Sequence, residues 1–421
     1  MASLGLGRRV LIIVENLPCP FDRRVWQEAR TLRDAGCEVS IICPTGRGYE
    51  TRYELLDGIH IYRHDLPVDA RGAVGYFLEY ASALAREFVL ALRIFFTRGF
   101  DVIHACNPPD NIFLIGGFFK LFFRRKFLFD HHDLCPELYL AKFNRKDLLY
   151  RLMLLWERWT FRLADVSIAT NESYRRIAIE RGRMAPERVF VVRSGPDLSR
   201  VRPVPTDPGL RQGRKHLVGY VGVIGKQEGI QYLLGAVQHI VNSLNRHDIH
   251  FGVVGAGPEL ERMRALAREL RIADYVTFTG RISDEELLAM LSTADVCINP
   301  DEFNEMNDKS TMNKIMEYMA LGKPIVQFDL AEGRISAGPA SLYARSNDAV
   351  DLADKIVELI DNPDRAGTMG RLGQQRVREE LSWEHQAPEL LKAYDALWTG
   401  AGAAAGCRPM CLSTRDGRQT N

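Results

Sequence analysis

Short runs of β-branched and aromatic residues alternate with helical patterns along almost the whole chain, and this alternation constrains the fold more than any other feature. It is typical of parallel sheets whose crossover connections are helices. We predict a first series of strands at 10–14, 38–43, 59–63, 101–105, 126–131, 165–170 and 188–193. A second series is predicted at 216–222, 249–255, 275–280, 295–300, 324–329 and 340–344. We therefore expect an α/β protein with two parallel-sheet domains.

A segment rich in proline, glycine and charge, RSGPDLSRVRPVPTDPGLRQGRK at 193–215, separates the two series. It lacks periodicity, so we interpret it as an interdomain connection. The predicted parts are an N-terminal domain at 1–195, a linker at 196–215, a C-terminal domain at 216–381 and a disordered tail at 399–421. Ligands bind at the carboxyl ends of parallel strands, so we expect the site in a cleft between the two domains.

Composition excludes several classes of protein. The 421 residues are 46% hydrophobic and 26% charged with a formal net charge of +1, which is typical of a soluble globular protein and gives no indication of nucleic-acid binding. The eight cysteines include no C-x-x-C pair, so we expect reduced thiols in a cytoplasmic protein. No uncharged apolar run reaches the roughly 18 residues that a membrane span requires.

A glycine-containing loop follows the first strand of the second series, in GYVGVIGKQEGIQYLL at 219–234. Gly222 and Gly225 bound the loop, Lys226 follows them, and a helix is predicted to start near Glu228. Backbone N–H groups at a helix N-terminus together with a lysine form a phosphate site. An ordinary strand-to-helix turn with a surface lysine explains the same residues, and the local sequence leaves both readings open.

A mostly apolar helix is predicted in NDKSTMNKIMEYMALGKP at 307–324, opening on Asp308, Ser310 and Thr311, which are good N-cap residue types. The partial positive charge of a helix N-terminus suits a diphosphate, and a carboxylate further along suits a ribose diol. The alternative is that Glu317 pairs with Lys314 on an exposed face. We favour a ligand, because the apolar neighbours indicate a half-buried helix and a buried carboxylate needs partners. The candidates here are Lys309, Ser310, Thr311, Lys314 and Glu317.

A cluster of histidines and carboxylates ends a strand of the first series, in FLFDHHDLCPELY at 127–139. It contains Asp130, His131, His132 and Asp133. The spacing is not that of metal ligands, so we predict no metal site. A histidine that faces the cleft and is polarised by a neighbouring aspartate fits substrate positioning better.

Taken together, several motifs make the chain from about residue 9 to 398 resemble a bacterial glycosyltransferase of family 4 with the GT-B fold, two Rossmann-like domains facing across a cleft. The motifs are FDRRVWQEARTLRDAGCEVSIICP, DHHDLCPELY, VVRSGPDLSR, GYVGVIGKQEGIQYLL, GAGPELERM, ADYVTFTGRIS and KIMEYMALGKPIV. The resemblance implies that a nucleotide sugar is the donor, that transfer is of the hexosyltransferase type and retains anomeric configuration, and that neither metal nor cofactor is needed. It also implies that the final helix, 382–398, crosses back onto the N-terminal domain.

The resemblance further assigns roles to individual residues. The catalytic candidates are His132, near the donor sugar, Lys226, on the diphosphate, and Glu317, on the ribose. Gly222 and Gly225 belong to the donor-binding set, and Gly225 allows the backbone to approach the phosphates. The acceptor-side candidates are Asp22, Arg23, Arg24 and Asp133. The sequence departs from the family pattern at Lys309, where a glutamate is usual, and at Ser194, where an asparagine is usual, so the donor sugar is left open.

A stretch of phenylalanines and basic residues, NIFLIGGFFKLFFRRKFLF at 111–129, suits an anionic membrane surface, and the helix predicted at 72–99 has an apolar face that could join it. The alternative is a core helix that ends in a basic loop. A peripheral enzyme on the inner face of the cytoplasmic membrane suits a lipid-linked acceptor in the synthesis of polysaccharide or another cell-envelope glycan. Two other functions stay open: a sugar-nucleotide epimerase on the same fold, and an inactive glycosyltransferase-like binding subunit.

Overall fold

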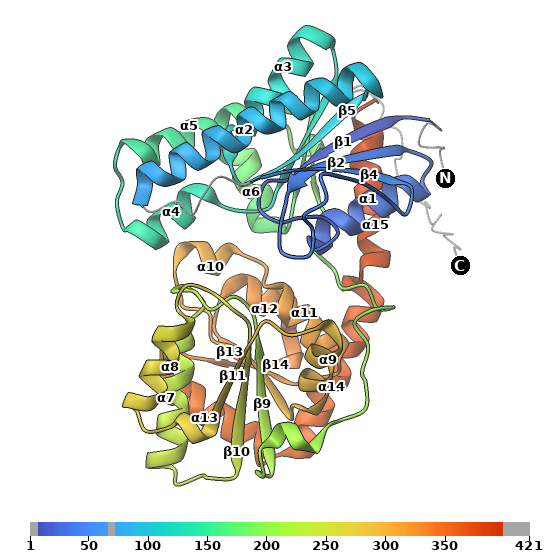
Figure 1. Cartoon of the computed structure of the whole chain (residues 1–421). Helices are drawn as coiled ribbons and strands as arrows, with labels where there is room; N and C mark the ends of the chain where they lie inside the picture. The colour runs from blue at the N-terminus through green and yellow to red at the C-terminus, as the bar shows by residue number, and fades with distance from the viewer. Residues whose placement is uncertain (1–6, 66–71, 399–421) are drawn as a thin grey trace, which may run out of the picture.

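The computed structural model describes residues 7–65 and 72–398, which form two α/β domains (Figure 1). Each domain is built on one sheet of mostly parallel strands, eight in the N-terminal domain and six in the C-terminal domain. The two parallel-sheet domains expected from the sequence are therefore confirmed. The tail predicted at 399–421 lies outside the described residues.

The N-terminal sheet has the strand order β3-β4-β2-β1-β5-β6-β7-β8. Its strands are β1 Arg9–Ile13, β2 Glu38–Pro44, β3 Tyr53–Leu56, β4 Ile59–His64, β5 Val102–Cys106, β6 Lys126–His131, β7 Val166–Ala169 and β8 Val189–Val191. All seven predicted strands are present. The sequence prediction missed β3, which pairs antiparallel with β4 at the sheet edge. The turn between them is Asp57-Gly58, with positive φ at both residues, and such a dipeptide is a strong hairpin signal.

The C-terminal sheet has the order β11-β10-β9-β12-β13-β14, with every pair parallel. Its strands are β9 His216–Val221, β10 Ile249–Val254, β11 Val276–Gly280, β12 Val296–Asn299, β13 Ile325–Phe328 and β14 Ser341–Ala344. All six correspond to predicted strands. The helices around it are α7 Ile230–Gln238, α8 Leu260–Glu269, α9 Asp284–Thr293, α10 Glu305–Lys309, α11 Asn313–Ala320, α12 Ala331–Ala337, α13 Ala349–Ile360 and α14 Pro363–Arg376.

Helices cover both faces of the N-terminal sheet, because its central strands are apolar on both sides. In β1, Val10 and Ile12 pack into one core, while Leu11 and Ile13 pack into the other. The first core receives α1 Arg23–Asp34 and α15 Trp383–Ala396; the second receives α2 Gly72–Thr97, α3 Phe113–Phe123, α5 Leu148–Leu163 and α6 Glu172–Glu180. The short α4 Cys135–Phe143 follows β6. The last helix, α15, thus packs against the N-terminal domain after the chain has completed the C-terminal one (Figure 1).

The prediction of one helix opening on Asp308, Ser310 and Thr311 is wrong. The structure has two helices, α10 and α11, and the chain between them is extended at Ser310. Helix α11 begins at Asn313, with Met312 at its N-cap and no side-chain cap. The hydroxyls of Ser310 and Thr311 contact the N-terminal domain instead, which explains why neither residue caps a helix.

The described helices and thiols bear on two further expectations. Within residues 7–65 and 72–398, no helix combines the length and apolar character needed to cross a membrane. The cysteines in that part of the chain are buried thiols that form no disulfide.

Candidate active site

Side chains from both domains meet where the loops at the carboxyl ends of the two sheets face each other. Arg23 at the start of α1 donates to Glu317 Oε1 of α11 at 3.1 Å and to Asp284 of α9 at 2.7 Å. Asn171, before α6, donates to Thr311 Oγ1 at 3.0 Å. These contacts place several predicted donor-site residues at the interface between the domains.

Glu317 is a mostly buried carboxylate, with 19% of its side chain exposed. Burial raises its pKa, and the guanidinium of Arg23 acts in the opposite direction. Glu317 therefore does not pair with Lys314 as the alternative reading had it. Lys314 binds Asp301, which follows β12, at 2.9 Å. The carboxylate of Glu317 faces the interdomain contact, where Arg23 binds it.

The loop after β9 is closely packed around its glycines. A Cβ at Gly222 would lie 2.6 Å from the Tyr220 hydroxyl, and one at Gly225 would lie 2.5 Å from Glu228 Oε2. Helix α7 begins at Ile230, two residues later than predicted. Lys226 is exposed and, within the described part of the chain, pairs with no carboxylate. The loop therefore has a tight backbone that depends on its glycines, and it places Lys226 at the surface.

Lys314 adds a second positive charge at this loop. Its Nζ lies 3.4 Å from the position of a Cβ on Gly222 and 4.9 Å from the centre of the Tyr220 ring. Lys309, in contrast, does not lie beside a helix N-terminus. It is the last residue of α10 and pairs with Glu305 at 2.6 Å, so the predicted placement of Lys309 is corrected.

Ser310 and Thr311 connect the domains. The Ser310 hydroxyl lies 2.9 Å from the Tyr174 hydroxyl and donates to the Met306 carbonyl at 2.7 Å. Asn171 also donates to the Lys309 carbonyl at 2.9 Å. In this structure these residues hold the segment between α10 and α11 against α6.

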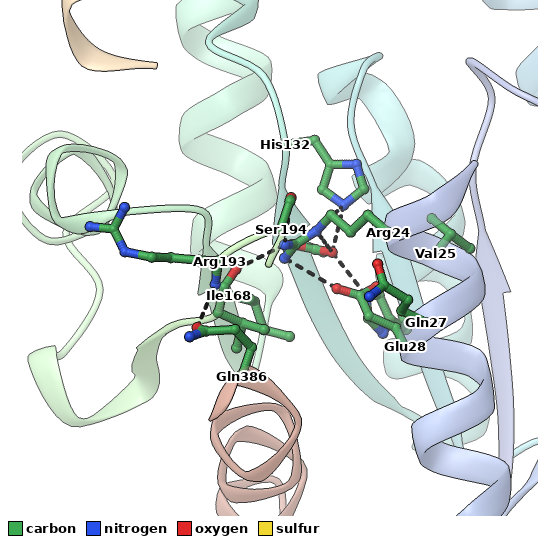
Figure 2. Close-up of polar contacts among 12 residues, drawn as sticks. Arg24, Val25, Gln27, Glu28, His132, Ile168, Arg193, Ser194 and Gln386 are labelled. Atoms are coloured by element: carbon green, nitrogen blue, oxygen red, sulfur yellow. Dashed lines mark hydrogen bonds and ion pairs between the residues drawn. The ribbon is translucent and has the colours of Figure 1, made fainter. Parts of the chain in front are cut away.

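In the N-terminal domain, Arg24 is the centre of a buried polar cluster (Figure 2). It is 8% exposed and binds Asp130 Oδ1 at 2.8 Å and Glu28 at 3.1 Å. It also donates to the Val192 carbonyl at 2.8 Å and to the Ser194 hydroxyl at 3.2 Å. With its guanidinium occupied in this way, Arg24 orients its neighbours and offers little surface to an acceptor.

His132 belongs to the same cluster. Its Nε2 lies 2.6 Å from Asp130 Oδ2 and 3.0 Å from Arg24 Nε. An unprotonated Nε2 and a carboxylate oxygen would repel each other at 2.6 Å, so Nε2 carries a proton and donates it to Asp130 Oδ2. Arg24 Nε–H lies 3.1 Å from the same oxygen and donates to it as well. Burial alone would raise the pKa of Asp130, but Arg24 and His132 hold it well below its usual range. The Nδ1 of His132 points away from the cluster (Figure 2).

A second layer, missed by the sequence analysis, supports Asp130 from the other side. His104 Nε2 lies 3.4 Å from Asp130 Oδ2, and its Nδ1 lies 2.9 Å from the hydroxyl of Tyr394 on α15. Burial lowers the pKa of His104 and raises that of Glu28. No local motif signals this layer, because its members come from four separate elements.

Two groups in this cluster have enough histidine, cysteine and carboxylate atoms to hold a metal ion. They are His104, Cys106 and Asp130, and Glu28, Asp130 and His132. In the second group the guanidinium of Arg24 lies within ion-pair distance of both carboxyl groups, 3.1 Å from Glu28 and 2.8 Å from Asp130. The two carboxyl groups of this second group are therefore already paired with the side-chain cation of Arg24.

Asn107, also missed, holds the turn that carries His132. Its Oδ1 accepts from the backbone N–H groups of His132 at 2.7 Å and Asp133 at 3.2 Å. Its Nδ2 donates to the Asp133 carbonyl and to Asp110 Oδ1, both at 2.7 Å. The Asp133 side chain has its pKa raised by burial.

Asp22 differs from the other acceptor-side candidates, because its carboxylate caps α1. It accepts from the backbone N–H of Val25 at 3.1 Å. Such a cap satisfies one of the free amides of the first helical turn. The four acceptor-side candidates thus divide into a helix cap, an interdomain contact at Arg23, a buried centre at Arg24, and Asp133 beside His132.

Two family models match the chain. The model described as "Glycosyltransferase Family 4" matches residues 22–200, and that described as "Glycosyl transferases group 1" matches 215–362. A 2-deoxystreptamine glucosyltransferase of Streptomyces kanamyceticus is 26% identical over 250 residues, which are 57% of this chain and 62% of that protein. A D-inositol 3-phosphate glycosyltransferase of Nocardia farcinica is 29% identical over 258 residues, 58% of this chain and 55% of that protein. The chain thus spans less than two thirds of the length of these relatives.

Solved structures share the fold over nearly the whole chain. Sucrose-phosphate synthase from Thermosynechococcus elongatus superposes with a TM-score of 0.74 at 20% identity, covering 93% of this chain and 99% of that one. Anabaena HepE, solved in complex with UDP and glucose, superposes with a TM-score of 0.71 at 17% identity, covering 92% of this chain and 100% of that one. With the two facing parallel-sheet domains, these similarities confirm the GT-B fold.

Proposed function

Because the chain is a glycosyltransferase of the family 4 type, we propose that it transfers a sugar from a nucleotide-sugar donor to an acceptor with retention of anomeric configuration. The observation that carries the proposal is the pairing of Glu317 on the C-terminal domain with Arg23 on the N-terminal domain. A carboxylate kept mostly buried at a domain interface is suited to accept hydrogen bonds from a ribose diol. The nucleotide would then compete with Arg23 for Glu317.

The diphosphate of the donor would lie against the loop between Gly222 and Lys226. Breaking a glycosyl phosphate bond builds negative charge on the leaving diphosphate, and fixed positive groups at that place lower the barrier. Lys226 and Lys314 supply such groups. This supports transfer without a metal ion or cofactor.

His132 would act on the donor sugar. Its Nε2–H is fixed by Asp130, which leaves Nδ1 able to accept a hydrogen bond from a sugar hydroxyl. A positioned imidazole of this kind orients the reacting carbon towards the acceptor and stabilises charge that develops on the ring.

The acceptor side of the proposal includes a lipid and an anionic membrane surface at the inner face of the cytoplasmic membrane, where the product would enter polysaccharide or another envelope glycan. Ile115 and Phe119 of α3 pack into the core, while Leu121 and Phe122 in its last turn are 69% and 72% exposed. Arg124 follows them and is exposed too. Exposed apolar side chains beside basic ones are the composition of an interfacial helix.

The experiment that tests the donor site is calorimetry with UDP and GDP, preceded by a thermal-shift screen of nucleotide sugars. We expect one nucleoside diphosphate to bind in the micromolar range typical of substrates, about 1 μM to 1 mM. Product analysis with and without a lipid acceptor then separates transfer from epimerisation. Failure of every nucleotide to bind would remove the proposal.

Flotation with vesicles tests the membrane part. Vesicles with anionic lipid should carry the protein upward, and neutral vesicles should carry less of it. The variant Arg124→Glu should reduce flotation. Equal flotation of the variant and the wild type would remove the membrane surface from the proposal.

A further inference from the structure

We propose that a cleft between α4 and α5 binds the apolar chain of the lipid-linked acceptor next to its reacting end. The inference rests on the proposed function, and it adds where the lipid chain binds and that the ligand is a lipid phosphate. The space that the cleft encloses is narrow, about 60 Å³, and it is open to solvent at its mouth. Its walls include Leu138 and Phe143 of α4 and Leu149, Met153 and Trp156 of α5. A narrow space with aliphatic and aromatic walls suits the thin cross-section of a single hydrocarbon chain better than the width of a sugar or a base.

The base of the cleft carries a single carboxyl group, Asp110. It is 2% exposed; its Oδ1 accepts from Asn107, the Cys135 thiol lies beside the carboxyl, and Oδ2 makes no further hydrogen bond within the described residues. Burial, with Glu157 nearby, raises its pKa to about 8, so at neutral pH it is mostly the uncharged acid. An uncharged acid does not repel an apolar chain, and its unpartnered atom can hydrogen-bond to a polar group at the end of that chain.

The cleft also lies next to the reaction centre. Asn107 binds Asp110 with its amide nitrogen and the backbone of His132 and Asp133 with its oxygen. One side chain thus joins the base of the cleft to the turn that carries His132. Lys142 lines the cleft and is one of the cations that counter the effect of burial on the pKa of Asp133. This places a positive charge where the phosphate of a lipid phosphate would lie.

The outer surface supplies the route by which a chain would enter. Helix α5, which forms one wall, exposes Leu148, Leu155 and Trp159 on its other side. It lies beside α3, whose exposed Leu121 and Phe122 belong to the proposed membrane surface (Figure 1). An acyl or isoprenoid chain anchored in the membrane would therefore meet apolar side chains from the bilayer to the cleft. A nucleoside or a free sugar would find few polar partners on these walls.

The test uses decyl phosphate, below the concentration at which it forms micelles, as the probe for the cleft. Calorimetry should detect binding to the wild type, and inorganic phosphate should not compete for the site, because the chain provides most of the affinity. The variant Met153→Trp fills the cleft and should weaken decyl phosphate binding by about tenfold or more. The matched control Arg151→Trp places the same side chain two residues away at an exposed position of α5 outside the cleft, and it should bind decyl phosphate as the wild type does.

UDP binding distinguishes a failure of this inference from a failure of the proposed function. All three proteins should bind UDP, or the nucleotide selected in the screen, equally, which also shows that Met153→Trp is folded. Should Met153→Trp not fold, Leu149→Trp fills the same cleft from the first turn of α5. Unchanged decyl phosphate binding in the filled variants, or equal competition by inorganic phosphate, would overturn the cleft assignment. Decyl phosphate binding that depends on Met153 in a protein that binds no nucleotide would retain the cleft and overturn the glycosyltransferase proposal.

Discussion

The two halves of the candidate site are built in opposite ways. In the N-terminal domain, His132 is held by Asp130, and Asp130 by Arg24 and His104, all largely buried. In the C-terminal domain, Lys226 is exposed and unpaired within the described residues, and the loop that carries it depends on glycines. The comparison indicates that the N-terminal half is organised in advance by buried pairs, whereas the C-terminal half has a closely packed loop whose lysine is left available to a ligand.

The largest expected effect comes from removing the central cation of the N-terminal half. Arg24→Met should lower the free energy of unfolding by about 3–5 kcal/mol, because breaking a buried ion pair leaves uncompensated buried charge. Chemical denaturation measures this. The control Arg23→Met removes the neighbouring arginine, which is half-exposed at the interface, and should cost less than about 1 kcal/mol. Equal losses in the two variants would contradict the view that the N-terminal half is organised in advance.

Removal of the imidazole should separate chemistry from binding. In His132→Ala we expect turnover to fall by about 10²–10⁴-fold, the range associated with a positioned proton-transfer or charge-stabilising group. UDP affinity, measured by calorimetry, should stay close to that of the wild type, since His132 lies on the other domain. A His132→Ala enzyme with weakened nucleotide binding and normal turnover would reverse the assignment.

The C-terminal half is tested through Glu317. In Glu317→Ala the dissociation constant for the nucleotide should rise by about tenfold to a hundredfold, because hydrogen bonds to a charged group contribute roughly 1.5–3 kcal/mol. Lys309→Ala is the comparison variant. Lys309 already pairs with Glu305 on a partly exposed surface, so its loss should change nucleotide affinity only slightly. If Glu317→Ala binds the nucleotide as tightly as the wild type does, Glu317 does not bind the ribose.

A last test concerns pH. Folding raises the pKa of Asp110 from its ordinary value to about 8, so the folded protein holds this proton more tightly than the unfolded chain does. The resulting contribution to the free energy of unfolding is complete below the ordinary pKa and is lost as the pH rises through about 8. Asp110→Asn removes this contribution, so its unfolding temperature should fall less than that of the wild type between about pH 4 and pH 8. The neighbouring Glu157, with a pKa raised by burial to about 7, keeps part of the dependence in both proteins. Identical pH profiles would show that Asp110 is ionised in the folded protein.

The sequence predicted residues whose role depends on local features. Gly222 and Gly225 are recognisable because a strand, a short loop and a helix follow one another, and Glu317 because it is a carboxylate among apolar helical positions. The sequence prediction was wrong about Ser310 and Thr311 as helix caps because their role depends on distant partners rather than on local features. Their hydroxyls are good helix caps by type, but they bind Tyr174 and Asn171 of the other domain, and nothing in the local sequence announces partners so distant.

By itself, then, the sequence determined the strands, the order of the two domains and the glycine loop, because hydrophobic periodicity and backbone sterics act between near neighbours. Only the tertiary structure decided that Arg24 is a buried centre while Arg23, the next residue, reaches Glu317, which is 294 positions away. It also decided that Tyr394 of the last helix supports His104. Such pairs depend on how whole elements pack, and that packing is set by burial summed over both domains rather than by any single motif.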